Sequence, residues 1–197
     1  MKKKGLITII IVVVVVLAIY AWIKGSYNGM VQRQEGVEAQ WAQVENVYQR
    51  RADLIPNLVL TVKGYASHEA NTLAAVIEAR AKATSITIDP SNITPEQLTQ
   101  FQEAQDNLSG ALSRLLVNME RYPELKANEN FMALQSQLEG TENRITVERQ
   151  KFNESARNYN QYIRMFPRNI IAGMFDFEKV GYFKAQAGAD TAPKVEF

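Results

Sequence analysis

An uncharged apolar stretch at residues 6–23 constrains this chain more than any other feature of its sequence. It follows Lys2, Lys3 and Lys4, and 13 of its 18 residues are Leu, Ile or Val. As a helix it would be roughly 27 Å long, close to the hydrocarbon thickness of a bilayer. Its aliphatic side chains favour insertion by roughly 4–8 kcal/mol. The stretch therefore predicts a transmembrane helix, with the rest of the chain beside a lipid surface.

A cleaved signal peptide is the alternative interpretation of this stretch. Signal peptides carry a shorter apolar region, of about 7–15 residues, that ends in an A-x-A-like site. Ile19 and Ala21 match such a site poorly. Tyr20 and Trp22 lie at the far end of the stretch, where amphipathic rings suit the headgroup layer. We therefore favour an uncleaved membrane span.

The distribution of basic residues predicts how the span is oriented. Three lysines precede it, whereas Lys24 and Arg33 are the nearest basic residues that follow. Basic flanks stay on the cytoplasmic side of a membrane. The sequence therefore predicts a cytoplasmic N-terminus in the bacterial inner membrane, with the C-terminal body on its outer side.

The composition argues against several classes of function. The chain has 22 Lys and Arg against 21 Asp and Glu, and without the three N-terminal lysines 19 remain against 21. Nucleic-acid binding needs a clustered basic excess, so we expect no nucleic-acid partner. The chain has no cysteine and a single histidine, His68, which is poor material for metal sites and catalytic triads. We expect no metal, no cofactor, no catalytic residue and no enzymatic activity.

The body of the chain is predicted to form long helices. From Met30 to Tyr65 apolar residues recur at steps of four and three, which keeps one stripe on one helix face. Residues 24–29 contain two glycines and are predicted to form a hinge after the span. Pro56 should kink the first long helix, because its ring crowds the carbonyl of Ala52.

Two further long helices carry the same apolar stripe. Thr94 should cap the first of them, with Pro95 at its first position and Gln97 completing a capping box, and Pro123 should end it. The second runs from residue 131 to 166, and a short helix could follow at 168–175. These patterns predict an all-α helical bundle with elongated members.

The predicted domain organisation has five parts. They are a basic tail at 1–5, the transmembrane helix at 6–23, the hinge at 24–29, the bundle at 30–175 and an irregular tail at 176–197. In that tail, Val195 and Phe197 dock against the bundle or the segment is loose; the pattern leaves both open.

Several segments resemble the signature of the LemA family. They read YNGMVQRQEGVEAQWAQVENVYQRRADLIPNLVLTVKGYASHE at 27–69, YPELKANENFMALQSQLEGTENRI at 122–145, RQKFNESARNYNQYIRMFP at 149–167 and the closing PKVEF. The resemblance implies a bacterial membrane protein with one N-terminal span and a four-helix, up-and-down bundle. It implies no agreed biochemical activity.

Two groups of polar residues near the first long helix are candidate structural or partner-contact sites. Arg51 and Glu148 occupy inward positions on different helices, which suggests a partly buried ion pair. The alternative is that each reaches solvent near an end of the bundle. The second group combines charged and amide side chains with a proline. It forms a polar pocket at the kink that binds a peptide or a lipid headgroup, or it only produces the kink. We favour the second interpretation. Its members are Arg50, Arg51, Asp53, Pro56 and Asn57.

A third candidate site lies on the last long helix. Asn153, Tyr159, Asn160 and Arg164 could line a polar groove. Asn153 and Asn160 are seven residues apart and share a helix face, as do Asn160 and Arg164. Packing and hydrogen bonds on the helix surface are the alternative, which we favour.

These features predict a non-enzymatic, membrane-anchored helical scaffold that self-associates or organises envelope proteins or membrane shape. If the apolar stripe is wider than one bundle can bury, its exposed part favours contact with a second copy or with a partner protein. Confinement in a bilayer raises the effective concentration of neighbours. The alternatives are a monomeric adaptor that presents a helical groove to another envelope protein and, less favoured, an envelope enzyme. The expected partners are membrane lipid, a second copy of the chain and another envelope protein.

Overall fold

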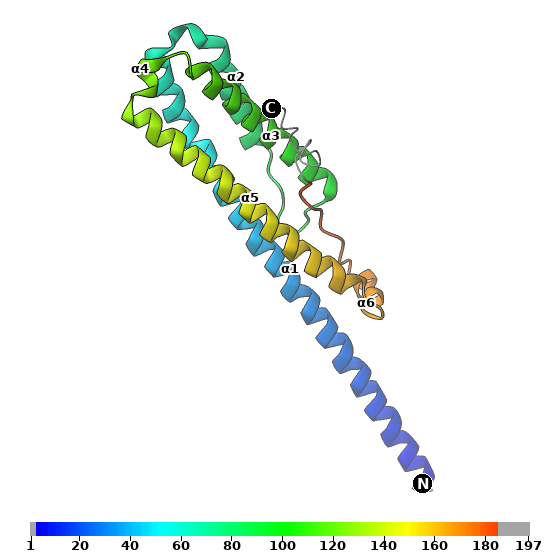
Figure 1. Cartoon of the computed structure of the whole chain (residues 1–197). Helices are drawn as coiled ribbons and strands as arrows, with labels where there is room; N and C mark the ends of the chain where they lie inside the picture. Colours follow the sequence, from blue (N-terminus) through cyan, green and yellow to red (C-terminus); the bar gives the residue numbers. More distant parts are fainter. Residues whose placement is uncertain (1–2, 185–197) are drawn as a thin grey trace, which may run out of the picture.

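The computed structural model describes residues 3–184, and this part of the chain is helical without any strand (Figure 1). The all-α prediction is therefore confirmed. The α-helices are α1 (Lys3–Tyr65), α2 (Ala70–Ser85), α3 (Pro95–Met119), α4 (Pro123–Lys126), α5 (Glu129–Arg164) and α6 (Arg168–Met174), with a 3₁₀ turn, η1 (Ser67–Glu69), before α2.

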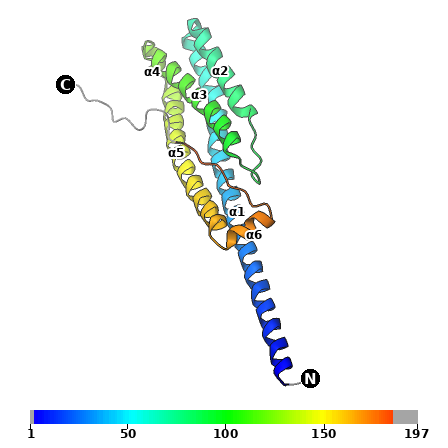
Figure 2. The same ribbon diagram turned by 90° about the vertical axis from the view of Figure 1, so that its right-hand side faces the viewer.

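Four of these helices alternate in direction along one axis. The bundle part of α1 runs antiparallel to α5, and the shorter helices α2 and α3 form a second antiparallel pair beside them (Figure 2). The short helix α4 turns the chain at the end of the bundle away from the N-terminus (Figure 1). The result is the elongated up-and-down bundle that the resemblance implied.

Helix α1 is one uninterrupted element of 63 residues. Its first turns project beyond the bundle, and the apolar stretch at 6–22 is exposed along its whole length (Figure 1). By length and composition this helix can cross a membrane. Within such a helix every backbone group away from the ends is hydrogen-bonded internally, as a membrane span requires.

The predicted hinge at residues 24–29 is wrong, because α1 is continuous there. The reason is tertiary packing. Ser26 and Met30 are buried, and the ring of Tyr27 meets those of Phe175 and Phe177 at 5.0 and 5.5 Å between centroids. These contacts outweigh the roughly 1 kcal/mol by which each glycine disfavours helix.

The interior of the bundle is divided into two apolar cores. The core nearer the span is rich in aromatic rings, with Trp41 in contact with Phe101 at 5.3 Å and with Phe152 at 5.6 Å. The distant core is mostly aliphatic and is built from α1, α2, α3, α4 and α5, as with Leu58 and Leu115. The apolar stripes predicted along the three long helices supply most of both cores.

The helix caps follow the sequence closely. Thr94 Oγ1 accepts a hydrogen bond from the backbone N–H of Gln97 at 3.2 Å, and the Gln97 side chain accepts one from the N–H of Thr94 at 3.1 Å. The predicted capping box is therefore confirmed. Asn128 caps α5 by accepting a hydrogen bond from the N–H of Phe131 at 3.0 Å, a cap for which we made no prediction.

Candidate functional site

A buried arginine joins three helices between the two cores. Arg51 on α1 is only 2% exposed and donates to Glu142 Oε2 at 2.9 Å and to Ser109 Oγ at 2.7 Å. It also donates to the side-chain oxygen of Gln105 at 2.6 Å and to the Gln105 carbonyl at 3.2 Å. Gln105 in turn donates to the carbonyl of Ala83, at the end of α2, at 3.2 Å. One polar layer therefore connects the four helices α1, α2, α3 and α5.

The predicted partner of Arg51, Glu148, is wrong. Trp41 of α1 contacts Phe152 of α5. Because the two helices are antiparallel, Arg51, ten residues after Trp41, lies beside Glu142, ten residues before Phe152. Glu148 lies nearer the membrane, where Gln40 donates to it at 2.7 Å and Lys151 at 2.8 Å. The hydrogen bond from Lys151 is the main cause that lowers the pKa of Glu148.

The segment at 50–57 does not form an open polar pocket. Arg80 on α2 donates from Nε to the carbonyl of Ala52 at 2.7 Å, so the group that proline frees is already satisfied. Asp53 accepts a hydrogen bond from Gln49 on the surface at 2.7 Å. The remaining residues of the predicted group, Arg50, Pro56 and Asn57, are exposed. α1 continues past the proline to residue 65.

Two buried tyrosines lie close to the aromatic core. Tyr48 is 5% exposed and its ring meets Phe101 edge-on at 5.1 Å. Burial raises the pKa of Tyr48 to about 12 against the opposing effect of Arg149 and Arg51. Burial, with a smaller effect of nearby carboxylates, likewise raises the pKa of Tyr159 to about 12. Tyr159, predicted to line a groove, is therefore mainly a core residue.

An extended segment at residues 180–184 lies across the bundle and is held by side-chain amides. Asn160 donates to the carbonyl of Val180 at 2.8 Å and accepts from its N–H at 2.9 Å. Asn153 makes the same pair of bonds to Phe183, at 2.9 Å each. We call this segment the strap.

The spacing of the two asparagines matches the strap. Seven residues of α-helix rise about 10.5 Å, and three residues of extended chain span about 10 Å. Asn153 and Asn160 are therefore separated by the same distance as the strap residues that they bind. Both bonds of each pair go to backbone groups, which requires an extended backbone, and Asn160 also donates to the hydroxyl of Tyr182 at 2.9 Å.

Further contacts fix both ends of the strap. Gln102 on α3 donates to the carbonyl of Lys184 at 3.1 Å and accepts from its N–H at 3.0 Å. The N–H of Gly181 donates to the carbonyl of Ile93 at 3.1 Å. A Cβ on Gly181 would lie 2.9 Å from the Cα of Pro95, so glycine allows this close approach.

The side chain of Phe183 completes the aromatic core. Its ring stacks on Trp41 at 6.1 Å and meets Phe152 edge-on at 5.4 Å. The guanidinium of Arg149 lies over the same ring at 4.8 Å from its centroid and also donates to the carbonyl of Lys184 at 2.8 Å. The strap is thus part of the fold, although it has no helix or strand.

The predicted polar groove is occupied by the chain itself. The structure brings Asn153 and Asn160 together on the strap, while Arg164 is exposed beside it and lines a cavity of about 700 Å³ with Asn160. Sequence analysis missed Gln102 and Arg149, which lie outside the apolar stripes that it followed. Val195 and Phe197 lie outside the described residues.

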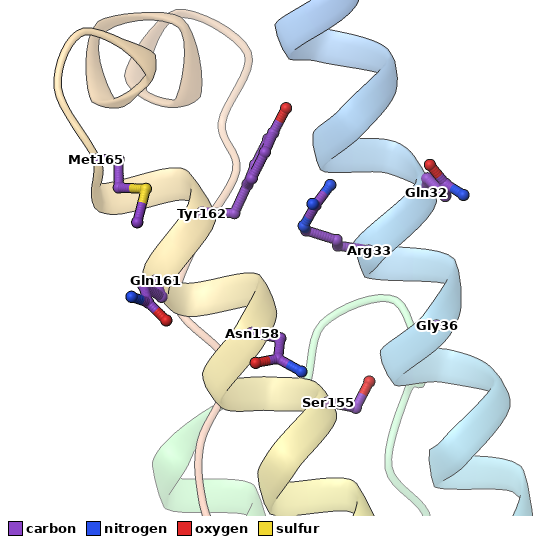
Figure 3. Close-up of a pocket in the computed structure, with 8 residues that line it drawn as sticks. All are labelled: Gln32, Arg33, Gly36, Ser155, Asn158, Gln161, Tyr162 and Met165. Atoms are coloured by element: carbon purple, nitrogen blue, oxygen red, sulfur yellow. The ribbon is translucent and has the colours of Figure 1, made fainter.

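An open cavity of about 560 Å³ lies between α1 and α5 near the end of the bundle that faces the span (Figure 3). The side chain of Arg33 points toward Tyr162, and its guanidinium lies over the ring, 3.7 Å from the centroid. The guanidinium of Arg168 lies 4.1 Å from the same centroid. The cavity therefore presents cationic and amide groups, which suit an anionic or peptide partner.

The membrane-interface residues are described in part. Tyr20 and Trp22 are 64% and 42% exposed on the projecting helix, and Lys2 lies outside the described residues. Among residues 3–184, no cluster of His and carboxylate side chains suits a metal ion.

An antiparallel helical bundle that continues directly into a helix able to cross a membrane defines a class of membrane-associated helical-bundle proteins. The comparison with known families is consistent with this class. A model of the LemA family matches residues 40–197, and the chain belongs to the LemA family. The resemblance seen in the sequence is therefore confirmed.

Similar proteins come from magnetic bacteria and from a mycoplasma. The chain is 26% identical to Magnetosome protein MamQ of Magnetospirillum gryphiswaldense, over 84% of this chain and 67% of that protein. It is 26% identical to Magnetosome protein MamQ 2 of Paramagnetospirillum magneticum, over 92% and 73%. It is 24% identical to Protein LemA of Metamycoplasma hominis, over 82% and 70%.

Proposed function

We propose that this protein is a non-enzymatic, membrane-anchored scaffold that self-associates and so organises envelope proteins or membrane shape. The observation that supports it is the continuity of α1 from the apolar stretch into the bundle. A helix without a break holds the bundle in a fixed position relative to the span. Neighbouring copies then present the same faces to one another, which reduces the orientational freedom lost on association.

The names of the relatives support this proposal. The two MamQ proteins are named for a structure, the magnetosome, and none of the three relatives is named for a reaction. The residues themselves also offer little for catalysis, since the single histidine, His68, is exposed in η1.

The test of the scaffold is the size of the full-length protein in nanodiscs, measured by mass photometry over a range of protein concentrations. We expect discrete multiples of the 22.3 kDa chain that grow with protein density in the bilayer. A monodisperse monomer at every density would contradict self-association.

The second candidate function is a monomeric adaptor, and the cavity between α1 and α5 favours it. The guanidinium groups of Arg33 and Arg168 both lie over the ring of Tyr162, and the amides of Asn158 and Gln161 line the same cavity. Such a site would suit an acidic segment of another envelope protein. A monomer that binds an acidic peptide, with binding lost in Arg33→Ala, would favour the adaptor over the scaffold.

We further propose that the bundle lies on the outer side of the bacterial inner membrane. The support is the lysine-rich N-terminus, which the positive-inside rule keeps in the cytoplasm. Asp89 is exposed in the loop between α2 and α3, so an Asp89→Cys variant offers a thiol in a chain without cysteine. We expect a membrane-impermeant maleimide to label this variant in intact spheroplasts. Labelling that requires lysis would contradict the orientation.

A further inference from the structure

The end of the bundle nearest the span carries an exposed apolar surface. The chain reverses after α5 and forms α6, and the large side chains here are uncovered. Phe166 is 82% exposed, Met174 70% and Ile170 55%. Ile170 and Met174 are four residues apart and share one face of α6, and Phe166 lies in the turn that precedes the helix. We call these three residues the α6 apolar face.

The opposite face of α6 is fixed to the bundle. Ile171 and Ala172 are buried in the aromatic core. The neighbouring Phe175 contacts Tyr27 of α1 at 5.0 Å between ring centroids. The exposed face of α6 is therefore held in place by packing on its other side.

The position of this face along α1, measured from the end of the apolar stretch, places it at the level of the lipid headgroups. Tyr27 lies four residues beyond the apolar stretch, which is about 6 Å along a helix. The headgroup layer on each side of a bilayer is about 5–7 Å thick. Figures 1 and 2 both show α6 beside α1 at the end of the bundle from which the N-terminal helix projects. An aromatic and aliphatic surface at that height faces the bilayer interface.

We propose that the α6 apolar face is a second membrane contact, which inserts into the interfacial layer of the bilayer that the N-terminal helix spans. Exposed Phe, Met and Ile side chains on a short helical face are suited to the boundary between headgroups and acyl chains. Lys24 and Arg164 nearby are exposed and able to meet lipid phosphates. Together with the span, this contact fixes the rotation of the bundle about α1 relative to the membrane.

The test uses the full-length protein in phosphatidylcholine nanodiscs whose acyl chains carry bromine, which quenches tryptophan on contact. The background variant is Trp22→Phe, which removes the tryptophan of the span. Trp41 remains, buried in the core and roughly 27 Å along α1 from residue 23, out of reach of the lipid. Phe166→Trp and Met174→Trp then place a probe on the α6 apolar face, one at a time.

The matched control is Leu60→Trp in the same background. Leu60 is 69% exposed on α1, toward the far end of the bundle. Far-ultraviolet circular dichroism checks that each variant keeps the helical content of the unchanged protein.

We expect bromine near the glycerol end of the acyl chains to quench the probes at 166 and 174 and to leave the control at 60 unquenched. Bromine near the methyl end should quench them less. Absence of lipid quenching at both positions would overturn the proposal. Emission that is blue-shifted but unquenched would overturn it as well, because it would assign the face to a second copy or another protein.

Discussion

Replacing Arg51 with alanine is expected to lower the unfolding free energy by about 3–4 kcal/mol. The substitution leaves a cavity between the two cores and removes the donor that satisfies the buried side chain and carbonyl of Gln105. Urea unfolding in detergent micelles, followed by circular dichroism, measures the loss. The control is Arg50→Ala, since Arg50 is the exposed neighbour and should change stability by no more than about 0.5 kcal/mol.

A double-mutant cycle identifies the partner of the arginine. Glu142 is 43% exposed, so solvent weakens its bond to Arg51 and we expect a coupling of about 1 kcal/mol. The cycle with Glu148 should be additive within about 0.3–0.5 kcal/mol, because the two side chains have separate partners. A larger coupling to Glu148 than to Glu142 would contradict the antiparallel register of α1 and α5.

The second large effect is expected from the double variant Asn153→Leu and Asn160→Leu. It removes one hydrogen bond to the hydroxyl of Tyr182 and four to the strap backbone, each of the four worth about 1 kcal/mol, and weakens the packing of Phe183 in the aromatic core. We expect a loss of about 4 kcal/mol in unfolding free energy. The amides of Val180 and Phe183 should exchange with deuterium at least about tenfold faster, since two lost bonds exceed 1.4 kcal/mol.

The control for the strap is Asn158→Leu, because Asn158 is exposed on the same helix and does not bind the strap. It should leave the exchange of Val180 and Phe183 unchanged. Unchanged exchange in the double variant would show that the asparagine pairs do not hold the strap.

Local patterns were enough to predict most of the helical architecture. Apolar side chains at steps of three and four can face one interior only if the segment is helical, so Trp41, Leu108 and Phe152 were predictable as core residues. The capping box at Thr94 was predictable because every atom involved lies within four residues.

Contacts between distant segments were not predictable in the same way. Arg51 was expected to be inward-facing, but its partner depends on how far α5 slides along α1, which no local pattern specifies. The strap has no periodicity, and Gln102 binds a residue 82 positions away. The predicted hinge failed for the same reason, since Tyr27 meets Phe175 and Phe177 from the other end of the chain.

The unbroken α1 also acts as a lever. From residue 23 to its end at Tyr65 it extends 42 residues, or roughly 63 Å. Transmembrane helices commonly tilt by about 20°, and at that angle the far tip would be displaced sideways by on the order of 20 Å. A bilayer that thickens or thins changes the tilt, and the rod converts that small change at its base into a large movement at its tip.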